Sequence, residues 1–427
     1  MIAGGTVPTI APEIVFNESL NIDALCFSEG ELPFVDLLKS DDISEVIREH
    51  QSWLSYSDFI KGKTVKAKLI SELNDIPPVV YSLIDMSQYT VGTSVMHNIE
   101  EDNPPFIMIS SRGCPFSCTF CCIASKQGKK MRFYTAERFL ADVDDLVVNH
   151  NMKRLWISDD QFLIDKKRAI DILTGLAKYN IDIQFPNGLS IRFFDEDVIK
   201  AFKFANVKTV ILALESGSER VLKELMNKPV DLEHTKKVVK MLRDVKICVI
   251  ATIIYGMPYE TAENRKECRD YIIDTGFDWI WAYTASPLKG SKLFDICVEN
   301  DFIKQEDFLE NNSSIFTGII NAPGVNPEKI SKEVYQLNLD VNFVNNFSYK
   351  NGDYDRAKKL FEQIVLKYPD HAFGYYFLSK TLKKIPHTPL SEISESMNKY
   401  FEIIHTDKVW YDHAKHFQLC TDKHSEC

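Results

Sequence analysis

The pattern of apolar and polar residues divides the chain into three parts. Between about residues 101 and 300, short apolar runs alternate with amphipathic stretches, and each run predicts a buried parallel strand. The runs are FIMISSRG (106–113), RLWISDD (154–160), DIQFPNGLS (182–190), TVILALESG (209–217), CVIATIIYG (248–256) and WIWAYTASP (279–287). Six strands, each followed by a helix, predict an α/β fold in the form of a partial (β/α)6 barrel. In such folds, function is carried at the C-terminal ends of the strands.

The parts on either side have different patterns. Residues 1–60 begin as strand, helix, strand and helix, at 1–5, 8–16, 23–30 and 31–40, and residues 61–100 look like a linker. Residues 301–427 are helical. Within them, the unit at about 345–382 has the small and large residues of a tetratricopeptide-like helix pair. One such repeat cannot stand alone, so we expect it to cap the barrel, with binding of a protein partner as the alternative.

Composition narrows the functional classes. The 427 residues carry a net charge of −11, so a nucleic-acid partner is not expected, although a local basic patch could override this. We find neither a secretory signal pattern nor an apolar run of membrane-spanning length, and therefore expect a cytoplasmic protein without a membrane partner.

The clearest chemical signal is a cluster of cysteines directly after the first predicted strand. Cys114, Cys118 and Cys121 follow the spacing C-x3-C-x2-C, and three thiolates on a short loop can ligate three irons of a 4Fe–4S cluster. The fourth iron then stays open to a small chelating molecule. A zinc site is the competing hypothesis, but Cys122 follows Cys121 directly and is poorly placed as a fourth ligand.

This cysteine loop, after the first strand of a six-strand β/α array, resembles the radical S-adenosylmethionine (radical SAM) superfamily over residues 101–300. The resemblance implies that the open iron binds S-adenosylmethionine. One electron from the cluster then cleaves the S–C5′ bond to a 5′-deoxyadenosyl radical, which abstracts a hydrogen atom. It also implies an electron donor such as flavodoxin or ferredoxin, while the protein supplies orientation and excludes water.

The resemblance also assigns residues at the ends of the second and third strands. Asp159 and Asp160 would lie near the amino group of the bound S-adenosylmethionine, or would cap the following helix. Arg192 would lie near the cofactor, with a solvated loop arginine as an equal alternative.

The fourth and fifth strand ends complete this predicted cofactor site. The segment LALESGSERVLKELMNK closely resembles a recurrent radical SAM segment, which implies that Glu215, Ser216 and Gly217 contact the cofactor carboxylate and ribose region. Gly256 and Pro258 would let the backbone approach the adenine or ribose.

The N-terminal part resembles the second half of the cobalamin-binding, doubly wound domain that precedes many radical SAM barrels. Gly4, Gly5 and Thr6 match the turn that lies along the cofactor tail in relatives. Residues 1–40 supply only two predicted strands, which are too few for a sheet, and no D-x-H-x-x-G segment offers a histidine ligand. We therefore interpret this part as a domain fragment and expect weak or absent cobalamin binding.

The sequence thus predicts a radical SAM enzyme acting on a small or peptide-like metabolite by methyl transfer, oxidative cyclisation or rearrangement. One alternative is a tRNA methylthiotransferase-like enzyme, but we see no second cysteine set and no RNA-binding β-domain. Another is a non-catalytic iron–sulfur or zinc scaffold that binds partners through the helical tail.

Overall fold

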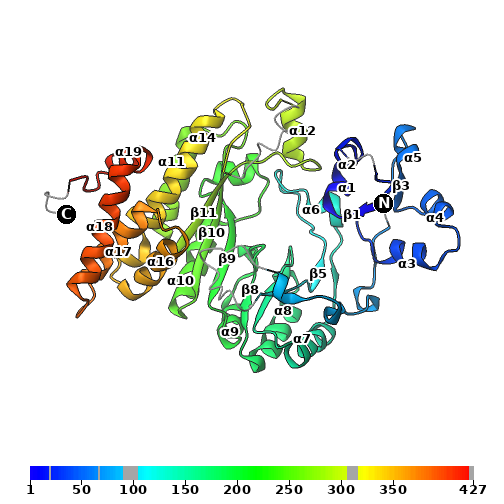
Figure 1. The fold of residues 1–427 in the computed structure, drawn as a ribbon, viewed down its shortest axis with the longest axis horizontal. Coiled ribbons are helices and arrows are strands. Elements are labelled where there is room, and N and C mark those ends of the chain that lie inside the picture. Colours follow the sequence, from blue (N-terminus) through cyan, green and yellow to red (C-terminus); the bar gives the residue numbers. More distant parts are fainter. Residues whose placement is uncertain (19–20, 66–67, 90–103, 305–315, 423–427) are drawn as a thin grey trace.

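The computed structural model describes residues 1–18, 21–65, 68–89, 104–304 and 316–422. Figure 1 shows the N-terminal unit at one end, the strands in the middle and the C-terminal helices at the other end. No helix among the described residues is long and apolar enough to cross a membrane.

The N-terminal unit contains one strand more than the sequence predicts. Its elements are β1 (Ile2–Gly4), α1 (Thr6–Ile10), α2 (Pro12–Glu18), β2 (Ala24–Cys26), α3 (Glu31–Lys39), α4 (Ile43–Glu49), β3 (Trp53–Ser55) and α5 (Tyr56–Ile60). β1 and β2 pair in parallel, and β3 adds antiparallel to β2. The helix predicted over 8–16 is wrong in detail, because the chain breaks at Ala11 before Pro12, where proline disfavours a helical residue.

The six predicted parallel strands are present in sequential order. They are β4 (Phe106–Met108), β7 (Arg154–Ile157), β8 (Asp182–Gln184), β9 (Thr209–Glu215), β10 (Cys248–Tyr255) and β11 (Trp279–Thr284). β4, β7 and β8 form one parallel sheet, and β9, β10 and β11 form another. Leu189 joins the two, because its N–H donates to the carbonyl of Ile211 at 2.8 Å and its carbonyl accepts from Ala213 N at 3.1 Å.

Helices follow the strands, as the apolar periodicity predicts. They are α7 (Ala136–His150), α8 (Lys166–Leu176), α9 (Glu196–Phe204), α10 (Leu232–Asp244), α11 (Ala262–Thr275) and α12 (Lys292–Glu299). Their apolar faces and one face of the strands form the largest buried core. The first predicted strand is shorter than expected: after Met108 the chain leaves the sheet, and β5 (Ser111–Arg112) pairs antiparallel with β6 (Arg132–Phe133) ahead of the cysteine loop, which is followed by α6 (Ile123–Gln127).

The first C-terminal helix lies along the edge of β11 and adds to the first core, and the later helices build a second core on the opposite face of β9, β10 and β11. These helices are α14 (Pro327–Leu339), α15 (Phe347–Lys350), α16 (Tyr354–Lys367), α17 (Ala372–Leu382), α18 (Leu390–Thr406) and α19 (Lys408–His416). A second core joins Ile211, Ile250 and Trp279 of the strands to aromatic side chains of this tail. The helical region therefore packs on the sheet, as expected for a cap.

A ladder of asparagine side chains covers the outer edge of β11. Asn338 accepts from Ala282 N and donates to Ala282 O, at 3.1 and 3.0 Å, and Asn342 does the same with Ile280, at 2.8 and 3.0 Å. The two residues lie one helical turn apart. Their amides therefore take the place of a neighbouring strand and pair with backbone N–H and C=O groups at the edge of β11.

Candidate functional site

The cysteine loop is held in a fixed conformation by backbone contacts. Gly113 has φ +96°, and an added Cβ would lie 2.4 Å from the carbonyl oxygen of Lys130, so only glycine fits. Cys114 N donates to Gly128 O at 3.2 Å, and Thr119 N donates to Met226 O at 2.8 Å. The hydrogen bond of Thr119 links the cysteine loop to the segment that follows β9, a strand of the other sheet.

All three predicted cluster ligands line one cavity of about 180 Å³. Burial raises the pKa of the thiols of Cys114, Cys118 and Cys121, for Cys121 to about 11. Deprotonating them therefore needs nearby positive charge, which bound iron supplies. Cys122 does not line the cavity and instead precedes α6.

The three cysteines share one cavity, as ligands of a single cluster must. Across the described part of the chain, no three His, Cys, Asp or Glu side chains converge as ligands of a single metal ion. Cubane ligands do not need to converge, because each thiolate binds a different iron.

Asp159 and Asp160, at the end of β7, have different environments. The fully buried carboxylate of Asp159 accepts from Ser110 N at 2.5 Å, Ser110 Oγ at 2.7 Å and Ser111 Oγ at 2.5 Å. It does not line the cavity, and its contact with the cofactor stays a prediction. Instead, it fixes the two serines that lead into the cysteine loop. Asp160 does line the cavity, and burial raises its pKa to about 6.

Gln161 is a cavity residue that the sequence analysis missed. Its Nε2 lies 3.5 Å from the Sγ of Cys114, and its Oε1 accepts from Ser190 Oγ at 2.8 Å. Arg192 also lines the cavity, and its guanidinium lies 5.4 Å from the ring centre of Phe116. This position favours the cofactor-side interpretation of Arg192 over a solvated loop residue.

Glu215 and Lys228 form a buried ion pair in the cavity wall. Lys228 Nζ lies 3.2 Å from Glu215 Oε1, and Thr252 Oγ1 donates to Glu215 Oε2 at 3.1 Å. Burial opposes the charge of Lys228, but Glu215 and Cys118 outweigh it, so its pKa is raised. Lys228 is therefore a permanent cation beside the cysteine loop, although the sequence marked it only as part of a recurrent segment.

Ser216 and Gly217, which are predicted to contact the cofactor, do not line this cavity. Ser216 is fully buried, and its Oγ accepts from Ser218 N at 3.1 Å. A Cβ on Gly217 would lie 2.7 Å from the ring of Tyr271, so this glycine allows α11 to pack closely.

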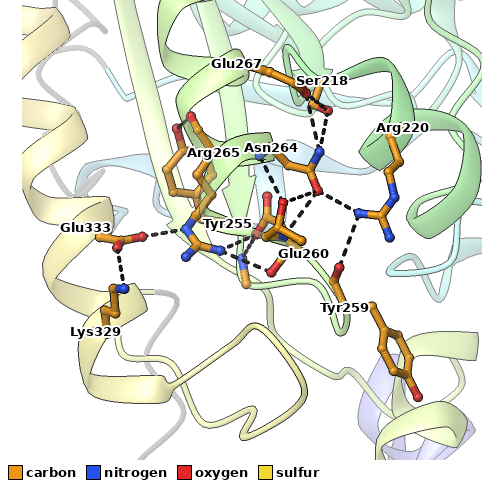
Figure 2. Close-up of polar contacts among 12 residues, drawn as sticks. Ser218, Arg220, Tyr255, Tyr259, Glu260, Asn264, Arg265, Glu267, Lys329 and Glu333 are labelled. Atoms are coloured by element: carbon orange, nitrogen blue, oxygen red, sulfur yellow. Dashed lines mark hydrogen bonds and ion pairs between the residues drawn. The ribbon is translucent and has the colours of Figure 1, made fainter.

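The Gly256–Pro258 turn after β10 is buried and also does not line the cavity. Gly256 N donates to Glu260 Oε2 at 2.5 Å, and burial raises the pKa of Glu260 to about 7. In Figure 2, Arg265 lies between Glu260 and Glu333, at 3.9 and 2.5 Å, and so links this turn to α14. These contacts with Glu260, Arg265 and Glu333 thus hold the turn in place.

The glycine turn after β1, which is predicted to lie along the cofactor tail, borders a separate cavity. Gly4 lines this cavity of about 440 Å³ together with Cys26, Gly30 and Trp53. Gly5 and Thr6 are exposed and do not line it.

A buried ion network connects the N-terminal unit to the cysteine loop. Arg132 Nη1 lies 2.7 and 2.8 Å from the two carboxylate oxygens of Glu29. Arg112, two residues before Cys114, lies 3.1 Å from Glu29 and 2.5 Å from Glu31. The unit therefore packs beside the candidate site.

Comparisons with known proteins agree with this geometry. The family model of the radical SAM superfamily matches residues 108–272, which contain the cysteine loop and the end of β9. Residues 108–272 therefore form a radical SAM domain. Such a domain implies a 4Fe–4S cluster and S-adenosylmethionine, and Cys114, Cys118 and Cys121, the predicted ligands of the cluster, line one cavity within it.

Two curated relatives are methyltransferases by name. An uncharacterized methyltransferase of Pyrococcus horikoshii is 30% identical over 71% of this chain and 64% of its own length. The cytidylyl-2-hydroxyethylphosphonate methyltransferase of Streptomyces wedmorensis is 30% identical over 60% of this chain and 47% of its own length. The chain thus spans about half to two thirds of these relatives.

A solved structure shares the fold. The radical S-adenosylmethionine methyltransferase TsrM from Kitasatospora setae, with cobalamin and a [4Fe-4S] cluster bound, superposes with a TM-score of 0.58. The match covers 95% of this chain and 82% of that one, at 12% identity.

Proposed function

We propose that this radical SAM protein cleaves one S-adenosylmethionine reductively to methionine and a 5′-deoxyadenosyl radical, which takes a hydrogen atom from a small or peptide-like metabolite. The resulting carbon radical would receive a methyl group that a second S-adenosylmethionine supplies through weakly bound cobalamin, with one further electron from the donor that reduces the cluster. The observation that carries the proposal is the shared cavity: three cysteines, two carboxylates and a buried lysine, drawn from three strand ends, line one space. A bound cluster with an open iron would supply the electron that cleaves the S–C5′ bond.

The chain's own residues orient the cofactor. Asp160 and Glu215 provide carboxylates for an ammonium group, and Lys228 provides a cation for a carboxylate. Phe116 and Phe120 border the cavity and exclude water from the cysteines. Asp159 acts indirectly, by fixing Ser110 and Ser111 ahead of the loop.

Methyl transfer is favoured over oxidative cyclisation or rearrangement by the names of the two relatives at 30% identity. A methylthiotransferase-like reaction is the second candidate, supported by a putative methylthiotransferase of Methanocaldococcus jannaschii at 26% identity. A non-catalytic scaffold has no such support.

The remaining proposals concern partners and architecture. We interpret the six strands as a partial (β/α)6 barrel and α16–α17 as the tetratricopeptide-like unit. Gly374 supports the latter, since it brings α17 close to Ile364 of α16. A flavodoxin or ferredoxin would supply the electron, and the cytoplasm is the proposed location.

Glu215→Gln is expected to weaken S-adenosylmethionine binding about tenfold, because a charge-assisted hydrogen bond is lost. Equilibrium dialysis of radiolabelled S-adenosylmethionine against reconstituted chain measures the affinity. Glu219→Gln, at an exposed position three residues from Ser216, is the matched control. Asp160→Asn provides a second variant if the unpaired Lys228 prevents folding. Unchanged affinity in both site variants would remove these carboxylates from the proposed site.

The 427-residue chain is expected to retain little cobalamin after desalting. A doubly wound domain encloses its ligand at the edge of a complete sheet, and β1–β3 provide only three short strands beside the Gly4 cavity. The visible spectrum of the desalted protein measures retention. Stoichiometric retention by this chain alone would contradict the expectation.

A further inference from the structure

The inner face of β11 carries large aromatic side chains beside the candidate site. The strand register pairs Thr252 with Trp281 and Ile254 with Tyr283, so these side chains share the face on which Thr252 bonds to Glu215. Burial and the negative charge of Glu215 raise the pKa of Tyr283 to about 12. The aromatic row thus adjoins the carboxylate that lines the cysteine cavity.

A cavity of about 660 Å³ opens against this row. Its walls are mostly aromatic: Trp279, Trp281, Tyr283, Phe316, Tyr335 and Tyr368. This volume is typical of a small-molecule site, and flat rings stack favourably on such walls.

Several polar side chains in the wall already bond within the protein. Asn338 and Asn342 pair with the edge of β11, and Ser331 Oγ accepts from Gly318 N at 2.8 Å. His371 Nδ1 accepts from Gly374 N at 3.0 Å, and burial lowers the pKa of His371 to about 4, so the ring is neutral at pH 7.

A charged side chain also lines the aromatic cavity. Among the described residues that border the cavity, Lys367 is the only one with a permanent charge, and its Nζ lies 5.2 Å from the ring centre of Tyr368. Aromatic walls alone would suit a quaternary ammonium as well. The lysine disfavours a cation and attracts an anion.

We propose that this cavity binds the substrate, and that the substrate is a planar aromatic molecule carrying an acidic group. The ring system stacks on Trp281 and Tyr335, and the acidic group faces Lys367. This assignment rests on the proposed function. The reaction would occur at the cysteine cavity, which adjoins the end of the aromatic row that lies near Glu215.

Equilibrium dialysis with 2-naphthoate as the probe tests the proposal on the anaerobically reconstituted full chain. We expect 2-naphthoate to bind, and cyclohexanecarboxylate and naphthyltrimethylammonium to bind at least tenfold more weakly. Trp281→Ala and Lys367→Met should each weaken 2-naphthoate binding about tenfold. Lys359→Met, at an exposed position on the same helix, should not change it.

The outcomes separate this proposal from the proposed function. Binding of 2-naphthoate should survive Cys118→Ala, because no cysteine of the loop lines this cavity. Absence of 2-naphthoate binding, equal binding of the saturated or cationic probe, or insensitivity to Lys367→Met would overturn the substrate class. If Trp281→Ala does not fold, Lys367→Met still tests the substrate class, because the side chain of Lys367 is only half-buried.

Discussion

Replacing Cys118 with alanine is expected to abolish cluster assembly in the reconstituted chain. Wild-type protein should bind about four irons and show an absorption band at about 400 nm, as thiolate-ligated clusters do. Cys118, Cys114 and Cys121 line the same cavity, so loss of any one removes a third of the protein ligands. Iron analysis and the visible spectrum measure the effect.

Cys122→Ala provides the matched control for this prediction. Cys122 is adjacent in sequence and buried, but it lies outside the cavity. We expect its variant to retain the full iron content. Loss of iron in Cys122→Ala, with retention in Cys118→Ala, would show that the ligand assignment is wrong.

Arg132→Met is expected to lower the free energy of unfolding by about 3 kcal/mol, because the buried carboxylate of Glu29 then keeps one of its two arginine partners. Arg132 and Glu29 are only 6% and 7% exposed, and Arg132 also donates to Ile70 O and Gln127 O, at 2.7 and 2.9 Å. Arg112 still contacts Glu29 in this variant, so folding should survive.

Urea denaturation followed by circular dichroism measures this change. Arg48→Met is the control, because Arg48 pairs with Glu49 on the exposed surface, where an ion pair contributes little. An unfolding midpoint of Arg132→Met equal to that of Arg48→Met would mean that the Glu29–Arg132 network does not hold the N-terminal unit in place.

The sequence predicted the long strands and the cysteine loop well. Continuous apolar runs such as Thr209–Glu215 and Cys248–Tyr255 can be recognised because strands buried on both faces need no alternation. Close cysteine spacing is a local signal, so it needs no knowledge of the fold. By contrast, β3 was missed, because no glycine turn follows its three residues of the kind that marks the ends of β1 and β2.

The finer assignments depend on contacts that a single sequence does not contain. Asp159 and Asp160 are neighbours, and only the structure shows that the first turns to Ser110 while the second borders the cavity. Lys228 reaches Glu215 across a helical turn, and Gln161 reaches Cys114 from another strand. Such convergence depends on tertiary packing. The aromatic cavity depends on it too, because its walls come mostly from β11 (Trp279–Thr284) and from helices that begin at Pro327 and beyond.

The release of 5′-deoxyadenosine tests the central claim most directly. The reconstituted chain is incubated anaerobically with dithionite and S-adenosylmethionine, and the products are quantified by liquid chromatography with mass detection. We predict release by wild type and by Cys122→Ala, and none above background by Cys118→Ala. A wild-type chain with its full iron content that binds S-adenosylmethionine but yields no 5′-deoxyadenosine would contradict the assignment of reductive cleavage to this cavity.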